Sequence, residues 1–271
     1  DVFQRPGRNV DALDGLRALA ILAVVAFHCA TFSSWATERK ELAGALSPVQ
    51  QWVLNLWTGV DVFFVLSGFL IGRILLRNLA HGGRIHYAGF LARRSCRIFP
   101  AYYAVLVVAI FAIAPSAPPI FYFLFDARPL RSVAEHAWPN FLYLSNYLTP
   151  HGAPNPMSWA WSLCIEEHFY LVLPPLLWLT MRGPRGPLHA LGLATGLAVP
   201  LAARAWAWLD DPGVSVRAVY FLSHCRFDEL FVGVVVAWAH VRAGPGLERF
   251  ARRAGAALPA AGVLAIASGW A

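Results

Sequence analysis

Seven stretches of mainly apolar residues alternate with shorter polar segments along the 271-residue chain. A helix of roughly 20 residues crosses the ~30 Å apolar core of a bilayer, and six of the stretches come close to that length. The pattern therefore predicts an all-α, polytopic transmembrane helix bundle with six full spans and a truncated seventh. The predicted spans are Leu16–Ser33, Trp52–Leu76, Ile98–Ala114, Trp159–Thr180, Leu188–Leu209, Ala218–His240 and Ala256–Ala271. Because the last stretch stops at the final residue, we expect residues 1–271 to be a single membrane domain without its C-terminal helices.

The distribution of positive charge predicts the orientation of this bundle. Of the 22 Lys and Arg residues, thirteen lie at the chain start or after the second, fourth and sixth spans, and five lie in the opposite loops. Cytoplasmic loops carry the excess of basic residues, so the N-terminus is predicted to be cytoplasmic. Only 14% of the residues are charged, against about 25% in soluble domains. The net charge of +7 is not gathered on a basic, aromatic-rich surface, which argues against nucleic-acid binding.

Ionisable side chains inside the predicted spans are the strongest functional signal, because such groups are costly in a bilayer and mark functional sites. Along the first helix, Asp14, Arg17 and His28 share one face, which should look into the bundle. By the helical rise of ~1.5 Å per residue, four helices place polar groups roughly 10–14 Å below the outer membrane surface. These residues are His28, Asp61, Glu166, Glu167 and Arg226. Polar groups from four helices at one depth predict a buried reaction centre.

Two interpretations of these charges stay open at this point. Arg226 could form a structural ion pair with Asp61, Asp228 or Glu229, and a lone histidine in a helix is usually a packed residue. With a carboxylate at the same depth, however, His28 is a candidate general base, because imidazole titrates near neutral pH.

A group of arginines, Arg93, Arg94 and Arg97, precedes the third predicted span. Arg94 and Arg97 would lie one turn apart in a helix, and their guanidinium groups could grip one phosphate together. A cytoplasmic anchor that contacts lipid headgroups is the alternative. The four cysteines are widely spaced and the nine histidines are dispersed, so the sequence predicts no metal site.

Two further features concern packing and access. Gly68 and Gly72 form a small-x-x-x-small pattern, which allows close helix contact. The long segment Pro115–Ser158 is rich in proline and aromatic residues, and its stretch Asn140–Tyr147 predicts a short interfacial helix. A loop of this size at the mouth of a bundle suits acceptor binding, although it could also be a connector.

Five sequence blocks, in order, resemble the membrane-bound acyltransferase 3 family. They are Asp14–Ala20 followed by His28, Gly59–Ile71, Arg93–Tyr103, Trp161–Leu171 and Arg226–Gly233. The resemblance implies a fold of about ten spans that transfers an acyl group, usually acetyl, from coenzyme A to hydroxyls of cell-surface sugars or secreted molecules. It maps the family's histidine onto His28, its arginine pair onto Arg94 and Arg97, and its glutamate onto Glu166. Cys164 and His168 depart from the Ser and Gln that are common in the family.

Together these observations predict an O-acyltransferase of the bacterial cytoplasmic (inner) membrane that uses cytoplasmic acyl-CoA and a carbohydrate acceptor. Arg94 and Arg97, with Arg93, would hold the CoA phosphates, and His28 would act as base with Asp61 or Glu166 orienting its ring. The predicted supporting residues are Asp14, Arg17, Trp161, Ser162 and Arg226. An acyl-histidine or acyl-cysteine relay stays open. The alternative is a proton-coupled secondary transporter or flippase, which is disfavoured because no inverted repeat is found.

Overall fold

The computed structural model describes residues 9–36, 52–53, 55–81, 85–113, 136–148, 155–181, 187–214, 219–255 and 257. Within these ranges the chain forms helices and turns and no β-strand. The longer helices are α1 (Asn9–Ala36), α3 (Gly59–Ala80), α4 (Tyr87–Val108), α8 (Trp161–Met181), α9 (Pro187–Asp210) and α11 (Ser223–Ala254). The short elements are η2 (Asn55–Thr58), η3 (Ala109–Ile113), α6 (Trp138–Phe141), α7 (Ser145–Leu148) and η6 (Ser158–Ala160). The prediction of an all-α fold is confirmed.

Four helical segments among the described residues are long and apolar enough to cross a membrane: Leu13–Ala30, Asn55–Ala80, Tyr87–Phe111 and Pro187–Asp210. Helices α8 and α11 have 21 and 32 residues but are not among these four, because they carry the charged residues described below. The seventh predicted span lies, except for Ala257, outside the described residues.

Helix α4 begins eleven residues earlier than predicted, at Tyr87 rather than Ile98. Arg93, Arg94 and Arg97 therefore lie inside a membrane-capable helix and not in the segment that leads to it. The sequence-based boundary was wrong because a basic stretch lowers local hydropathy even where the chain continues as a helix.

The centre of the bundle is the contact between α3 and α11. A Cβ atom added to Gly68 would lie 1.9 Å from the carbonyl oxygen of Leu230, and one added to Gly233 would lie 2.1 Å from that of Val65. Gly72 meets Val234 in the same way, one turn further along. The small-residue pattern predicted from Gly68 and Gly72 is thus confirmed as a backbone-to-backbone contact.

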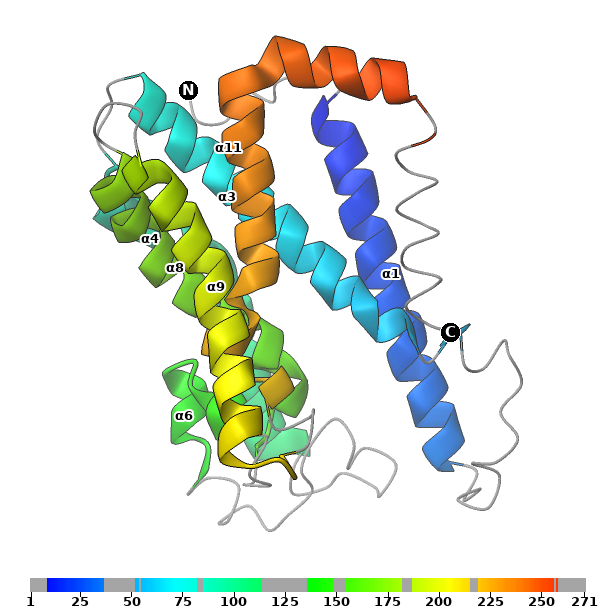
Figure 1. The fold of residues 1–271 in the computed structure, drawn as a ribbon. Coiled ribbons are helices and arrows are strands. Elements are labelled where there is room, and N and C mark those ends of the chain that lie inside the picture. The colour runs from blue at the N-terminus through cyan, green and yellow to red at the C-terminus, as the bar shows by residue number, and fades with distance from the viewer. Residues whose placement is uncertain are drawn as a thin grey trace.

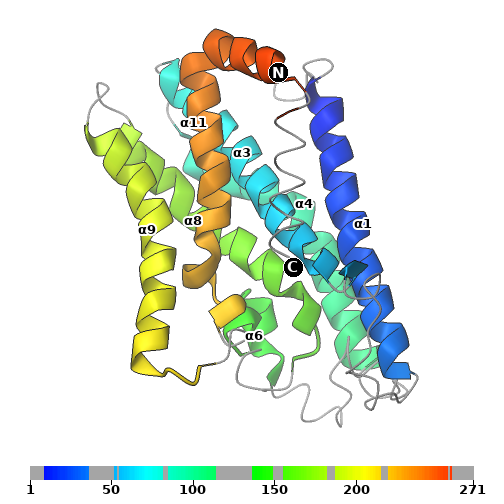
Figure 2. The same cartoon turned by 45° about the vertical axis from the view of Figure 1, so that its right-hand side comes forward.

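Helix α3 crosses the molecule diagonally, between α1 on one side and α8, α9 and α11 on the other (Figures 1 and 2). Helix α1 packs against the beginning of α3, where a Cβ on Gly59 would meet Ala20 and Val24. Within its apolar stretch, 6% of the residues are buried, against 50% for the α3 stretch. The polar face predicted for α1 meets the bundle at Val24 and half-buries Arg17 and His28, but it leaves the Asp14 side chain 63% exposed.

Helix α11 bends sharply at Ala243, whose backbone angles (φ −114°, ψ 21°) are not helical. Pro245 explains the bend, because proline lacks the amide hydrogen that an intact helix needs. The second part of α11 then runs across one end of the bundle towards the beginning of α1 (Figures 1 and 2). The end of α3 lies at this same end, so we call it the arginine-rich end, because Arg77, Arg249, Arg252 and Arg253 lie there.

The short helices α6 and α7 cover part of the opposite end. Tyr102 of α4 donates a hydrogen bond to the Asn140 carbonyl oxygen (2.9 Å), and Tyr103 donates one to that of Phe141 (2.9 Å). Tyr143, between α6 and α7, has a left-handed backbone (φ 57°) and stacks on Tyr102 with ring centroids 4.2 Å apart. The predicted interfacial helix over Asn140–Tyr147 is therefore two short helical turns. Residues 114–135 of the long segment lie outside the described residues.

Candidate functional site

A buried carboxylate, that of Glu166 in α8, lies at the meeting point of α3, α4 and α8. The Glu166 side chain is hydrogen-bonded at both oxygens: Ser67 of α3 donates to Oε1 (2.7 Å) and Tyr170 donates to Oε2 (2.9 Å). All three residues are buried. We call Ser67, Glu166, Tyr170 and Arg94 the Glu166 cluster. Both oxygens of this buried carboxyl group thus have hydrogen-bond donors, as buried polar groups normally do.

Arginines surround this carboxylate without forming a direct ion pair with it among the described contacts. The Arg94 guanidinium of α4 lies over the Tyr170 ring, 5.2 Å from its centroid. Arg17 of α1 and Arg94 both attract the Glu166 carboxylate electrostatically, and Arg17 is also close enough to Arg97 for the two positive charges to repel each other. Two helices, α1 and α4, thus bring positive charge to one buried acid.

An open cavity of about 270 Å³ begins at Arg97, beside the Glu166 cluster. Its walls are mainly apolar and consist of Arg97, Ile98, Ala101, Tyr102, Val105, Met157, Trp159 and Leu163. Along α4 the cavity extends from the middle of the helix towards its last turn, away from the arginine-rich end. An open, mainly apolar cavity with a cation in its lining can take a thin flexible arm with a charged end.

A second charged group lies where α3, α8 and α11 begin. Arg226 of α11 forms ion pairs with Asp61 of α3 and with Glu229 (2.8 Å). Next to it, Arg204 of α9 binds Asp228 through two hydrogen bonds of 2.6 and 3.1 Å. The alternative of an ion pair for Arg226 is therefore confirmed for Asp61 and Glu229, whereas Asp228 pairs with a different arginine.

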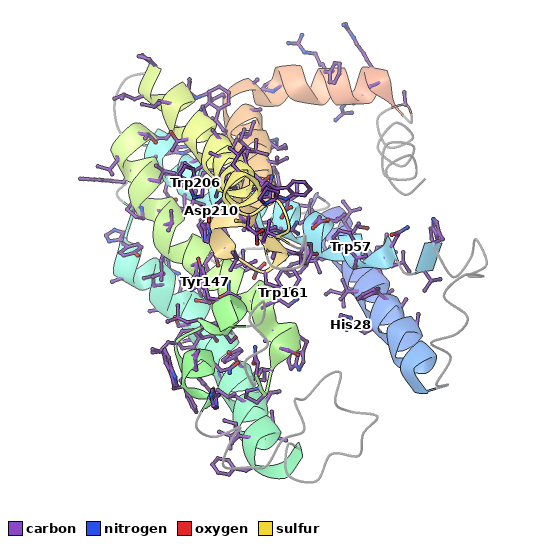
Figure 3. All side chains as sticks on the ribbon, turned by 60° about the horizontal axis from the view of Figure 1, so that its bottom comes forward. His28, Trp57, Tyr147, Trp161, Trp206 and Asp210 are labelled. Atoms are coloured by element: carbon purple, nitrogen blue, oxygen red, sulfur yellow. The ribbon has the colours of Figure 1, made fainter. Side chains whose placement is uncertain are left out.

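Aromatic rings enclose this ionic group. The Arg226 guanidinium lies 4.3 Å from the centroid of the Tyr220 ring, and Trp57 and Trp161 contact the same tyrosine with centroids 5.2 and 5.0 Å away. The three aromatic side chains are half-buried. Figure 3 shows Trp57 where α1 meets the start of α3, with Trp161 nearby. We call Trp57, Asp61, Trp161, Tyr220, Arg226 and Glu229 the Arg226 cluster.

The segment that carries Tyr220 is clamped by α7. The Asn146 amide donates to the carbonyl oxygen of Phe221 and to the Ser223 hydroxyl, both at 2.9 Å. The Ser223 hydroxyl also lies 2.6 Å from Nδ1 of His168 in α8, and Tyr147 bonds His224 at 3.1 Å. Sequence reasoning missed this network, because its partners are 55 to 77 residues apart and belong to no periodic pattern.

Beneath the clamp, Tyr143 is buried and its hydroxyl has no hydrogen-bond partner among the described residues. Burial raises the pKa of this hydroxyl above its ordinary value. The group therefore stays neutral, which suits a packing role against Tyr102.

His28, the candidate base, lies on α1 beside the start of α3 (Figure 3). Its Nδ1 is 2.7 Å from the Val24 carbonyl oxygen. A carbonyl only accepts hydrogen bonds, so Nδ1 carries the proton and Nε2 holds the lone pair. Among the described residues, neither Asp61 nor Glu166 contacts this ring. The structure thus brings together Asp61 with Arg226, and Glu166 with Arg94, but keeps His28 on the separate helix α1.

The other predicted residues are distributed as follows. Arg17 pairs with Asp14 at 3.8 Å, Trp161 belongs to the Arg226 cluster, and Ser162 follows it in the first turn of α8. Arg93 is exposed on α4. No group of three His, Cys, Asp or Glu side chains suited to a metal ion occurs in the part of the chain that the structure describes.

A helical bundle with membrane-capable helices, which buries a hydrogen-bonded carboxylate near arginines, has the features of a membrane protein with a functional site inside its bundle. The family is shown by sequence comparison: the profile described as an acyltransferase domain, acyltransferase 3, matches residues 10–266. The chain belongs to this family, which confirms the resemblance seen in the sequence. It is a membrane protein of an acyltransferase family.

Several curated proteins are similar to this chain. Peptidoglycan O-acetyltransferase OatA of Listeria monocytogenes is 32% identical over 270 residues, covering 96% of this chain and 38% of the relative. The putative peptidoglycan O-acetyltransferase YrhL of Bacillus subtilis is 30% identical, with 85% and 33% covered. O-acetyltransferase OatA of Staphylococcus aureus is 26% identical, with 85% and 35% covered. The chain thus spans 33–38% of the length of these relatives. No solved structure matches it.

Proposed function

We propose that this domain transfers an acyl group, in the first place acetyl, from acyl-CoA to a hydroxyl of a cell-envelope carbohydrate. The observation that carries the proposal is the Glu166 cluster: a buried carboxylate among arginines of two other helices, next to a cavity that starts at Arg97. Membership of the acyltransferase family and relatives named for peptidoglycan O-acetylation support the same reaction.

The donor is bound from the arginine-rich end. Its phosphates are too polar for the bilayer, so they stay near that end, where Arg93 is exposed, Arg94 follows it directly, and Arg97 lies about one turn deeper on the same helix. Guanidinium groups bind phosphate through paired hydrogen bonds. The thin pantetheine arm then follows the apolar cavity along α4 and brings the thioester towards the opposite end of the bundle. In a membrane this places the N-terminus and the donor on the cytoplasmic side, as the positive charges predict.

His28 is the base of this proposal. The bond from Nδ1 to the Val24 carbonyl selects the tautomer whose Nε2 can accept a proton. Nε2 takes the proton of the acceptor hydroxyl while the hydroxyl oxygen attacks the thioester carbon. The carbon–sulfur bond breaks, and the CoA thiolate leaves and takes the proton from the imidazolium. The negative charge of Glu166 stabilises the arginines that draw the donor into the cavity, and the imidazolium that forms.

The experiment measures transfer of labelled acetyl from acetyl-CoA to a peptidoglycan-derived glycan by the purified protein in detergent, together with acetyl-CoA binding by calorimetry. His28→Ala should remove turnover and keep acetyl-CoA binding. Arg94→Ala with Arg97→Ala should raise the acetyl-CoA concentration for half-maximal rate at least tenfold. Trp206→Ala, which changes an exposed side chain of α9 outside both clusters, is the control and should behave as the wild type. Wild-type protein that neither binds nor consumes acetyl-CoA would contradict the proposal.

A further inference from the structure

The Arg226 cluster has no task in donor binding, yet it is built like a ligand site. We propose that it is the subsite that holds a sugar ring of the acceptor, with Trp57 and Trp161 as side walls and with Asp61, Arg226 and Glu229 as partners for sugar hydroxyls. This inference rests on the proposed function and names the part of the molecule that binds its second substrate.

The position of the cluster suits an acceptor. Asp61 precedes Ser67 by six residues on α3, which places the two clusters about 9 Å apart along that helix. Phe64 lies between Asp61 and Ser67 on α3 and packs against the Arg226 cluster: its ring is 6.2 Å from that of Trp161 and 5.9 Å from the Arg226 guanidinium. The Arg226 cluster lies at the beginnings of α3, α8 and α11, opposite the arginine-rich end. Donor and acceptor would therefore approach from opposite ends of the bundle.

The chemistry of the side chains suits a neutral polyol. A sugar ring has an apolar face of C–H groups and a rim of hydroxyls, and half-buried Trp and Tyr rings present flat apolar surfaces for such a face. Among the described residues, the three acids Asp61, Asp228 and Glu229 form ion pairs with two arginines, Arg204 and Arg226. This excess of carboxylates disfavours a phosphate but leaves acceptors for hydroxyl donors. The cluster therefore differs in ligand preference from the arginines near Glu166.

Two buried polar atoms of the cluster still lack partners. Arg226 Nε and Glu229 Oε2 are buried and form no hydrogen bond with any described residue. Buried polar atoms are normally paired. A sugar hydroxyl can both accept from a donor such as Nε and donate to an acceptor such as Oε2. An ion pair kept for stability alone gains little, because desolvation of its charges offsets their attraction.

The site is also held rigid. Asn146 fixes the Phe221 carbonyl and Ser223 on either side of the segment that leads into α11, and the ring of Phe221 contacts Trp161 (5.1 Å). A binding site benefits from rigid side chains, because the conformational entropy of the contacting residues is then lost during folding and not during ligand binding.

The test is calorimetric titration of the detergent-purified protein with a peptidoglycan-derived tetrasaccharide, with acetyl-CoA binding measured on each variant. Trp57→Ala should weaken glycan binding at least tenfold and leave acetyl-CoA binding unchanged, and Trp57→Phe should restore part of the loss. Asp61→Asn should weaken glycan binding by a similar factor. Trp206→Ala, a 71% exposed tryptophan on α9 (Figure 3), is the matched control and should bind both ligands normally.

Glycan binding of Trp57→Ala at the wild-type level would overturn the subsite, as would wild-type protein that binds acetyl-CoA but not the tetrasaccharide. Either result would leave the acyltransferase proposal standing, because that proposal fails only if acetyl-CoA is neither bound nor consumed. An equal loss of both ligands in Trp57→Ala, not restored in Trp57→Phe, would show a packing role and also overturn the subsite.

Discussion

The Glu166 cluster and the Arg226 cluster use the same residue types in opposite ways. In the first, the carboxylate receives hydrogen bonds from the neutral groups of Ser67 and Tyr170, and arginines stay nearby without a direct ion pair. In the second, Arg226 is clasped by Asp61 and Glu229. The first arrangement leaves the positive charge of the arginines available for an anionic ligand. In the second, the carboxylates neutralise the positive charge of Arg226.

The two clusters contain similar charged residues and differ mainly in how these residues are paired. Pairing, more than the number of charges, therefore determines which ligand each part of the site can bind. Both clusters share α3 and α8, and both are enclosed by apolar residues. What differs is the partner group that contacts each carboxylate. A hydroxyl donor keeps the acid ready to act on a visiting charge, whereas a guanidinium partner neutralises it and leaves hydrogen-bonding geometry as the remaining means of recognition.

The largest effect should come from breaking the Glu166 cluster. Glu166→Gln replaces the acid with a neutral amide and places its NH2 against one of the two donors, Ser67 or Tyr170. We therefore expect at least a 100-fold loss of acetyl transfer, in the range of a lost catalytic group. The loss should persist at saturating glycan. Asp61→Asn, by contrast, should be rescued by more glycan. Transfer by Glu166→Gln within tenfold of the wild type would mean that the cluster is only structural.

A smaller effect is expected from the contact that joins the two regions. Gly68→Ala would place a Cβ 1.9 Å from the Leu230 carbonyl, and such overpacking typically costs about 1–3 kcal/mol. Thermal unfolding in detergent should show the loss, and glycan binding should weaken before acetyl-CoA binding, because α11 carries Arg226. Gly15→Ala, where nothing lies within 4 Å of the new atom, should unfold as the wild type does. If both variants unfold at the same temperature, the α3–α11 contact is looser than described.

The smallest effect should come from Tyr170→Phe, which sharpens the comparison. The change deletes the 2.9 Å hydrogen bond to Glu166 but keeps the ring beneath Arg94. A hydrogen bond to a charged group contributes about 1.5–3 kcal/mol, so kcat should fall by roughly tenfold or somewhat more while the acetyl-CoA requirement stays constant. A changed acetyl-CoA requirement with constant kcat would show that the hydroxyl acts through Arg94 instead.

Much of the fold could be predicted from the sequence, because bilayer-spanning helices and close glycine contacts leave strong local patterns. The runs of apolar residues located α3 and α9. Gly68 with Gly72 predicted a close helix contact, and the structure shows that α11 is the partner. The start of α4 was misplaced because hydropathy falls over Arg93 and Arg94 although the helix continues.

The candidate site was predictable in its members but not in its partners. Helical depth brought Asp61 and Arg226 to one level, and the structure joins them. Depth alone could not separate Glu166 from that pair, because it ignores the angle at which α3 crosses the bundle. The clamp of Asn146, Ser223 and His168 unites three distant segments, and only tertiary structure reveals such a network.

The bend in α11 fixes the position of the helix bundle along the membrane normal. Arg226 and Arg242 lie sixteen residues apart on one straight helix, about 24 Å along its axis. Beyond the bend, Arg249, Arg252 and Arg253 turn sideways with the exposed ring of Phe250 among them, the composition of a segment that rests on a lipid surface. We therefore expect this segment to lie on the membrane surface and to set the depth at which the whole bundle is inserted. That depth in turn sets the distance of the site from the opposite surface of the bilayer.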